Sequence, residues 1–299
     1  MVEAHERERK QRMEKQRIFI DDILSNENMN RAYKQVIKNK GAAGIDGMEW
    51  NDLLSHLKEN GHQLRESIRN QSYKPMPVKR VEIPKDNGSK RKLGIPTVTD
   101  RMIQQAAAQV LTPIYERKFH TNSYGFRPGK SAQQAVLKAT EYMNEGYNWV
   151  VDIDLEKFFD TVEHDKMISI LNKEIKDGKT LSLIRKFLVS GVMVGEQMEE
   201  TEIGTPQGGN ISPLLANILL NELDWELESR GLRFVRYADD CIILVRSEKA
   251  AIRVMKSVTK YIENVLRLKV NKDKSRIGRP TEIQYLGFAF YYQFQEKKY

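Results

Sequence analysis

Apolar residues recur every three or four positions along several stretches of the chain, a spacing that puts them on one face of an α-helix. In residues 250–266 this face is expected to include Ile252 and Val265. The same spacing predicts helices over residues 18–40, 51–66, 99–115, 132–146, 161–175, 181–191 and 214–228. Residues 1–17 are densely charged with interleaved signs, and they predict a solvated helix or an arm that touches RNA.

Runs of apolar and β-branched residues predict strands between these helices. Residues 234–245 hold two such runs on either side of a short break, which is the pattern of a β-hairpin. Prolines exclude a helix from residues 73–85, and a turn leads from there into a returning strand at 90–96. Further extended segments are expected at 149–155, 192–201, 268–271 and 283–290.

The composition describes a soluble globular chain of 299 residues, with 40% hydrophobic and 30% charged residues. The net charge of +8 weakly favours a polyanionic partner. The single cysteine, Cys241, excludes a disulfide framework and a cysteine-based zinc site, and a buried thiol is expected. No apolar run reaches the roughly 18–20 residues of a membrane span, and the charged start is unlike a signal or transit peptide. An intracellular protein is therefore expected.

Two adjacent carboxylates, Asp239 and Asp240, occupy the break in the 234–245 hairpin. Two acids in a tight turn between hydrophobic strands repel each other, and a divalent cation such as Mg²⁺ would relieve that repulsion. The alternative is a polar hairpin tip with two solvated aspartates, because aspartate is common at turns. The turn by itself does not decide between these interpretations.

A third carboxylate comes from the expected strand at 149–155, where Asp152 and Asp154 project from the same face. If this strand neighbours the hairpin, Asp154 converges with Asp239 and Asp240. Three carboxylates in that arrangement can hold two divalent ions about 3.5–4 Å apart, as in nucleotidyl transfer. Purely structural carboxylates are the alternative.

Three further segments have the chemistry to contact a nucleotide or a nucleic acid. The segment 73–96 is rich in cations, which suit a triphosphate or a nucleic-acid backbone or guard an exposed edge against aggregation. In the loop 204–213, Gln207 can hydrogen-bond in both directions, although a tight strand-to-helix connection is the alternative. In the loop 123–131, aromatic residues beside Arg127 can stack on a base or plug the edge of the core.

Together these segments resemble the reverse transcriptase domain of group II intron-encoded proteins, also called intron maturases. The resemblance covers about residues 20–295, and its central motif is Tyr237-Ala238-Asp239-Asp240. Six further segments accompany it: RVEIPK (80–85), LGIPT (93–97), SYGFRP (123–128), VDIDLEKFFD (151–160), GTPQGG (204–209) and YLGF (285–288). Each segment alone is weak, whereas the full set in this order is highly specific.

The resemblance implies roles for individual residues. Asp154, Asp239 and Asp240 match the catalytic ligands of two Mg²⁺ ions. Phe159, five residues after Asp154, matches an aromatic residue that disfavours ribonucleotides through a clash with the 2′-hydroxyl. Other residues that the resemblance implies for the incoming nucleotide are Lys85, Arg91, Gln207 and Lys274. Residues assigned to the RNA template are Lys79, Arg80 and Arg127.

The implied fold is α+β, with the fingers and palm of a right-hand polymerase and an antiparallel palm sheet backed by helices. Residues 1–20 are expected to form a charged arm, 21–150 the fingers with an N-terminal extension, and 151–299 mainly the palm, with 194–215 shared between them. Family members continue into a helical thumb. This chain stops just after the palm, so the thumb is expected to be absent.

The implied function is RNA-directed DNA synthesis that copies intron RNA into DNA for retrohoming, with a DNA primer and dNTPs as the other partners. The same protein would bind intron RNA as a maturase and assist splicing. A splicing cofactor and an RNA-templated RNA polymerase are the alternatives, and Phe159 argues against the second. A homodimer is compatible with the sequence, no membrane partner is expected, and a bacterial host would place the chain in the cytoplasm.

Overall fold

The computed structural model describes residues 19–84, 90–194, 197–199, 208–293 and 298–299. The chain divides into two compact units whose segments alternate along the sequence. One unit comprises the chain up to Ile114 and His164–Ser212, and the other comprises Tyr115–Glu163 and Pro213–Tyr299. The named fingers and palm ranges stay a prediction, and most of the expected arm lies outside the described residues.

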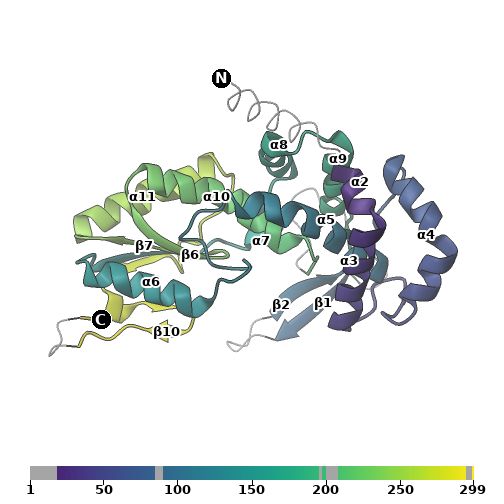
Figure 1. The fold of residues 1–299 in the computed structure, drawn as a ribbon. Helices are drawn as coiled ribbons and strands as arrows, with labels where there is room; N and C mark the ends of the chain where they lie inside the picture. Colours follow the sequence, from purple (N-terminus) through teal and green to yellow (C-terminus); the bar gives the residue numbers. More distant parts are fainter. Residues whose placement is uncertain (1–18, 85–89, 195–196, 200–207, 294–297) are drawn as a thin grey trace, which may run out of the picture. The chain divides into compact units, whose positions relative to one another are not determined.

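The first unit combines helices with a small mixed sheet (Figure 1). Its helices are α2 (Phe19–Leu24), α3 (Asn26–Asn39), α4 (Leu53–Arg69), most of α5 (Val98–Glu116), α8 (His164–Glu174) and α9 (Gly178–Leu188). Its strands are β1 (Val78–Pro84), β2 (Lys90–Ile95), β4 (Val192–Val194) and β5 (Gln197–Glu199), in the order β2-β1-β4-β5. β1 and β2 pair antiparallel, so the basic hairpin expected from the sequence is confirmed.

Buried polar side chains fix the helices of this unit against each other. The Ser25 hydroxyl accepts a hydrogen bond from the Asn28 backbone and so caps α3. Asn28 is itself buried, and its amide donates to the carbonyls of Ile23 and Ala106 at 3.0 and 2.9 Å. These bonds tie α3 to α5, because a buried amide must find partners within the protein.

The second unit is built on an antiparallel sheet of four strands (Figure 1). Its strands are β3 (Trp149–Ile153), β6 (Arg233–Tyr237), β7 (Asp240–Val245) and β8 (Arg276–Gly278), in the order β6-β7-β3-β8. Its other elements are α6 (Ala132–Asn144), α7 (Phe158–Thr161), nearly all of α10 (Ser212–Ser229), α11 (Glu248–Asn264), η1 (Pro280–Glu282), β9 (Gln284–Tyr285) and β10 (Phe288–Ala289). All neighbouring pairs in the four-stranded sheet are antiparallel, as expected.

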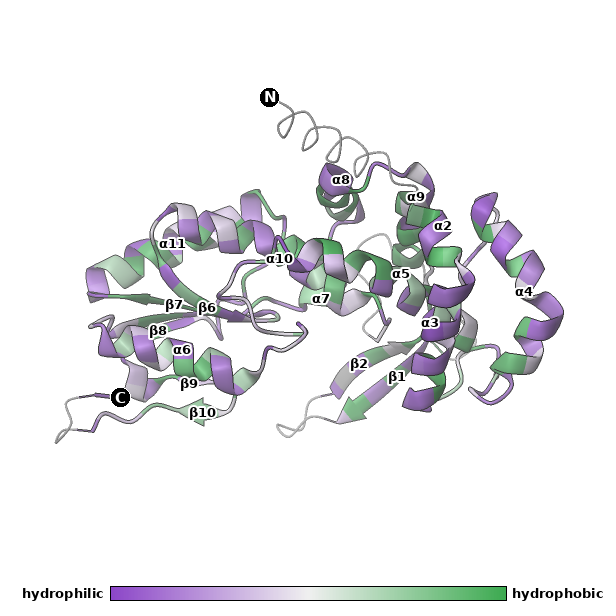
Figure 2. Ribbon diagram, viewed as in Figure 1, coloured by the Kyte–Doolittle hydropathy of each residue, from purple (hydrophilic) through white to green (hydrophobic). Residues whose placement is uncertain are grey.

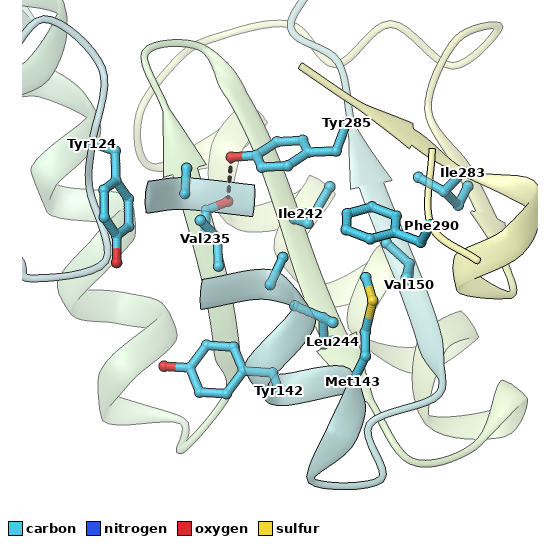
Figure 3. Close-up of a cluster of buried hydrophobic side chains, with 12 residues drawn as sticks. Tyr124, Tyr142, Met143, Val150, Val235, Ile242, Leu244, Ile283, Tyr285 and Phe290 are labelled. Carbon is cyan, nitrogen blue, oxygen red and sulfur yellow. Dashed lines mark hydrogen bonds between the residues drawn. The ribbon is translucent and has the colours of Figure 1, made fainter. Parts of the chain in front are cut away.

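One face of this sheet packs against α6 and the segment around β9 (Figure 3). Val150, Ile242 and Leu244 come from the central strands and are completely buried there. Figure 3 also shows the Tyr285 hydroxyl, which donates a hydrogen bond of 3.2 Å to the carbonyl of Val235. α11 also packs on this sheet, on the side away from α6 (Figure 1), and Figure 2 shows β7 as mostly hydrophobic residues. The central strands are therefore rigidly held, and their ends are well placed to carry a site.

The helices differ from the expectations in two details. The helix predicted over 161–175 is confirmed as α8 but begins at His164, because Val162 is extended after the separate single turn of α7. Ile252 and Val265 are 55% and 43% exposed, since α11 buries only a narrow face centred on Val258 and Ile262. Cys241 is buried, as expected. In the described part of the chain, no helix has both the length and the apolar character to cross a membrane.

Candidate active site

The hairpin of β6 and β7 closes through a two-residue turn. Tyr237 pairs with Asp240, so that Ala238 and Asp239 form the turn itself. Ala238 has a φ of +56°, which a residue with a side chain adopts only when its surroundings enforce it. Asp239 is half-buried, and Asp240 is exposed at the start of β7. The predicted acid pair therefore lies at a tight and conformationally constrained hairpin tip.

Gly125 packs directly against this turn. A Cβ at position 125 would lie 2.2 Å from the backbone nitrogen of Ala238. We expect Gly125→Ala to lower the free energy of unfolding by about 1–3 kcal/mol, because an overpacked backbone contact can relax only by moving the turn. Urea unfolding measures this loss. Gly178→Ala is the matched control, since a Cβ at Gly178 meets nothing within 4 Å, and equal midpoints for the two variants would contradict the prediction.

Asp154 follows β3 at the same end of the sheet as the acid pair. The β3–β7 register pairs Ile153 with Cys241, so one further step along both strands brings Asp154 opposite Asp240. The Asp154 backbone is fixed on both sides: its N–H donates to Ser275 Oγ at 3.1 Å, and its carbonyl accepts from the Asn271 N–H at 2.9 Å. The loop that holds Asp154 is thus the loop that carries Lys274, whose side chain is exposed.

The charges at this end of the sheet repel one another. Partial burial of the carboxyl, and then the negative charges of Asp239, Asp152 and Asp154, raise the pKa of Asp240 to about 6. The residue as a whole is still exposed, so water reaches the Asp240 carboxyl. We therefore attribute more of its raised pKa to the three neighbouring carboxylates than to burial. Burial also raises the pKa of Asp152, against the opposing effect of Arg276, whose Nε lies 3.3 Å from an Asp152 carboxylate oxygen. Negative charge is therefore concentrated and only partly compensated here.

A closed set of metal ligands is not assembled. Among the residues that the structure describes, no three carboxylate, imidazole or thiol side chains form a group that could hold a metal ion. Asp154, Asp239 and Asp240 therefore share one end of the sheet and act on one another through their charges. Their oxygen atoms still suit a hard divalent cation. The raised pKa of Asp240 marks the negative charge that such a cation would neutralise.

Phe159 lies close to Asp154 along the chain, in the single turn of α7. Lys157, with a φ of +45°, turns the chain into this helix. Phe158 is buried, and its ring packs edge-on against that of Phe159 with centroids 5.1 Å apart. Phe159 itself is half-buried. The Phe158 ring is therefore part of the core, whereas the Phe159 ring stays partly accessible. The role of Phe159 in rejecting ribonucleotides stays a prediction.

The remaining nucleotide and template residues belong mostly to the β1–β2 hairpin. Lys79 is exposed on β1, and Lys90 forms an ion pair of 2.9 Å with Glu82. Arg80 is half-buried, and its Nε has no hydrogen-bond partner within the described structure. Arg91 pairs with Ile83 through its backbone. Residues Lys85 and Gln207, and the side chain of Arg91, lie outside what the structure describes, so their roles stay predictions.

Arg127, which the resemblance assigns to the RNA template, makes its hydrogen bonds within the protein, and its role in RNA binding stays a prediction. Its Nε and Nη2 donate to the carboxylate of Glu116 at 3.0–3.2 Å. Its Nη1 donates to the carbonyls of His120 and Ser123 at 2.7 Å, and the side chain is only 7% exposed. The guanidinium stacks over the ring of Phe119. Most of its hydrogen bonds thus hold the 120–127 loop in place.

Sequence reasoning missed Arg236, which lies inside β6 and is completely buried. Its guanidinium contacts Asp224 and the turn that carries the acid pair. The only signal in the sequence was a lone cation between apolar strand residues, just before the turn. That signal does not distinguish a buried side chain from one at an exposed strand position.

Known proteins resemble this chain over most of its length. The family described as "Reverse transcriptase (RNA-dependent DNA polymerase)" matches residues 83–290. Protein YkfC of Escherichia coli (strain K12) is 32% identical over 90% of this chain and 80% of its own length. Group II intron-encoded protein LtrA of Lactococcus lactis subsp. cremoris is 32% identical over 86% of this chain and 54% of its own length. A chain of a partial Cas6-RT-Cas1–Cas2 complex is similar in structure, with a TM-score of 0.53, 26% identity, and coverage of 84% of this chain and 43% of that chain.

These matches confirm the α+β reverse transcriptase fold that the sequence implied. The chain spans most of YkfC, about half of LtrA, and less than half of the Cas6-RT-Cas1 chain. Reverse transcriptases bind an RNA template and nucleotides and generally use divalent metal ions. The chain belongs to the reverse transcriptase (RNA-dependent DNA polymerase) family, as a domain of the group II intron-encoded and maturase-related kind.

Proposed function

We propose that this domain copies intron RNA into DNA from a DNA primer, with two Mg²⁺ ions held by Asp154, Asp239 and Asp240. The observation that supports the proposal is the position of Asp154, one register step beyond the last β3–β7 pair and at the same end of the sheet as the acid pair. When bound, the ions would activate the primer 3′-hydroxyl and neutralise the charge on the leaving pyrophosphate. This copying step is the DNA synthesis that retrohoming requires.

The protein's own contribution is to hold the carboxylates and the substrates in place. Ser275 and Asn271 fix the backbone of Asp154, while pairing of β6 with β7 fixes the acid pair. We assign the triphosphate to Lys85 and Arg91, and the pocket beside the template base to Gln207, on the strength of the resemblance. Lys79 and Arg80 are assigned to RNA, and Lys274 to protonation of pyrophosphate, because it is exposed on the loop that contacts Asp154.

Primer extension tests the proposal directly. The chain is incubated with an RNA template, an annealed DNA primer, dNTPs and Mg²⁺, and the products are resolved by length. We expect template-dependent DNA that disappears on chelation of the metal and returns when Mg²⁺ is added in excess. Synthesis that persists in the chelator would contradict a metal-dependent site.

Phe159→Val should relax the choice of sugar. We expect the preference for dNTPs over NTPs, as a ratio of kcat/KM values, to fall by roughly 10–100-fold, because steric rejection by one pocket side chain is worth a factor of that size. Single-nucleotide incorporation with each substrate measures it. Tyr291→Val, which shortens an 80% exposed aromatic residue, is the control. A wild-type preference for NTPs would instead favour an RNA-templated RNA polymerase.

A second role, binding intron RNA as a maturase that assists splicing, is supported by the similarity to LtrA and by the net charge of +8. Binding and splicing of an intron RNA by a variant that cannot polymerise tests this role. We expect Asp239→Ala/Asp240→Ala to bind the RNA as the wild type does, because the phosphate backbone is recognised by cations rather than by these acids. Loss of binding in that variant would show that the two roles share one site.

A further inference from the structure

Arg236 forms a complete hydrogen-bond network inside the second unit. Its Nε and Nη2 donate to the two carboxylate oxygens of Asp224 at 2.7 and 2.6 Å. Its Nη2 also donates to Ser123 Oγ at 2.8 Å, and its Nη1 donates to Asn217 Oδ1 at 2.9 Å and to the Ala238 carbonyl at 2.8 Å. A guanidinium has five N–H groups, and all five are used here. Arg236 and Asp224 are both 0% exposed.

The contact with Ala238 connects this network to the acid pair. The Ala238 carbonyl belongs to the peptide that continues into the backbone nitrogen of Asp239, and a peptide unit is planar. A hydrogen bond to that carbonyl therefore restricts the orientation of Asp239 as well. The need for such restraint is visible in the φ of +56° at Ala238, which a residue with a side chain rarely adopts.

The other side of the turn is tied to the same network. Asn217 accepts from Arg236, and its own amide donates to the Gly125 carbonyl at 2.8 Å. Gly125 is the residue that packs against the Ala238 backbone. Helix α10, through Asn217 and Asp224, thus supports the turn both through Arg236 and through Gly125.

A buried ion pair contributes little to stability beyond what packed apolar residues would provide. A role beyond stability is therefore worth testing for a pair that ends on a functional turn. We propose that Arg236, oriented by Asp224 and Asn217, is a positioning residue that holds the Ala238–Asp239 peptide and so aims the two carboxylates at the divalent cation. The effect of Arg236 on catalysis rests on the proposed function, whereas its effect on the conformation of the turn does not.

Two variants separate positioning from stability. Arg236→Met/Asp224→Leu removes both charges together, so no buried charge is left without a partner, while the contact with Ala238 is lost. Arg236→Lys keeps a charge for Asp224 but cannot reproduce five fixed N–H groups. The matched control is Arg230→Met/Glu226→Leu, which removes an ion pair four residues apart at the end of α10.

Three measurements on the full chain decide the outcome: hydrogen exchange of peptides spanning 236–241, Mn²⁺ binding by electron paramagnetic resonance, and primer-extension kinetics. In folded variants we expect faster exchange at the turn, and Mn²⁺ affinity and kcat lowered by roughly 10–100-fold, the usual effect of losing a residue that orients a metal ligand. The KM for dNTPs should not change. The control should resemble the wild type.

A folded variant with wild-type exchange and Mn²⁺ affinity would overturn the proposal. Failure of both variants to fold would also count against it, because the network would then act on stability alone. If the wild type binds no more Mn²⁺ than Asp239→Ala/Asp240→Ala, the metal site of the proposed function fails. Hydrogen exchange at the turn would still decide whether Arg236 positions it.

Discussion

Asp239→Ala/Asp240→Ala should reduce RNA-templated DNA synthesis by about 10³-fold or more, because metal ions stabilise such a transition state by several kcal/mol and each 1.36 kcal/mol corresponds to a factor of ten. Both acids lie at the two-residue turn, and Asp154 lies one register step beyond the last β3–β7 pair. Asp152 also acts on Asp240 through its charge, but it is paired with Arg276. The loss is measured as the rate of single-nucleotide incorporation at saturating dNTP.

The same double variant should not be less stable than the wild type. The two carboxylates repel each other and repel Asp154, so their removal relieves an unfavourable interaction in the folded protein. Thermal unfolding should therefore show an unchanged or higher midpoint. Glu145→Ala, which removes an exposed carboxylate at the end of α6, serves as the control for charge and should leave synthesis unchanged. Full activity in the double variant would refute the assignment of the site.

The sequence predicted the position of the acids because strands have strong local rules. The apolar runs in 149–155 and 234–245 predicted strands that are buried along most of their length, and the acids come where these runs end. Once these two segments pair, Asp154 must reach the turn. The apolar pattern does not show which strands are neighbours, and the structure shows that β3 pairs with β7.

The partners of two arginines, Arg127 and Arg236, could not be predicted from the sequence. Arg127 follows an exposed aromatic residue and resembles an RNA contact, yet its partners are Glu116 and two carbonyls of a loop that folds back on itself. Arg236 finds Asp224 on α10, which precedes β6 in the chain. Neither partner has a sequence signature, because both result from the tertiary path. The arrangement of the acids as ligands was likewise unpredictable, since it depends on a cation as well as on the strands.

Arg236→Ala should lower the free energy of unfolding by about 3–5 kcal/mol, the usual cost of removing one partner of a buried ion pair. The residue left behind, Asp224, is 0% exposed, so its charge would have neither water nor a cation near it. Domains are stable by only about 5–15 kcal/mol, so this one truncation would remove much of the total. Urea unfolding monitored by far-ultraviolet circular dichroism measures the loss.

The surface pair Arg230–Glu226 provides the comparison, because Arg230→Ala should cost only about 0–1 kcal/mol. Arg236→Met/Asp224→Leu should recover most of the stability that Arg236→Ala loses, since it leaves no unpaired buried charge. The three unfolding curves together distinguish the loss of a charge partner from the loss of packing. If packing were the cause, the double variant would be at least as unstable as Arg236→Ala, and the large loss expected for Arg236 could not be attributed to the isolated carboxylate of Asp224.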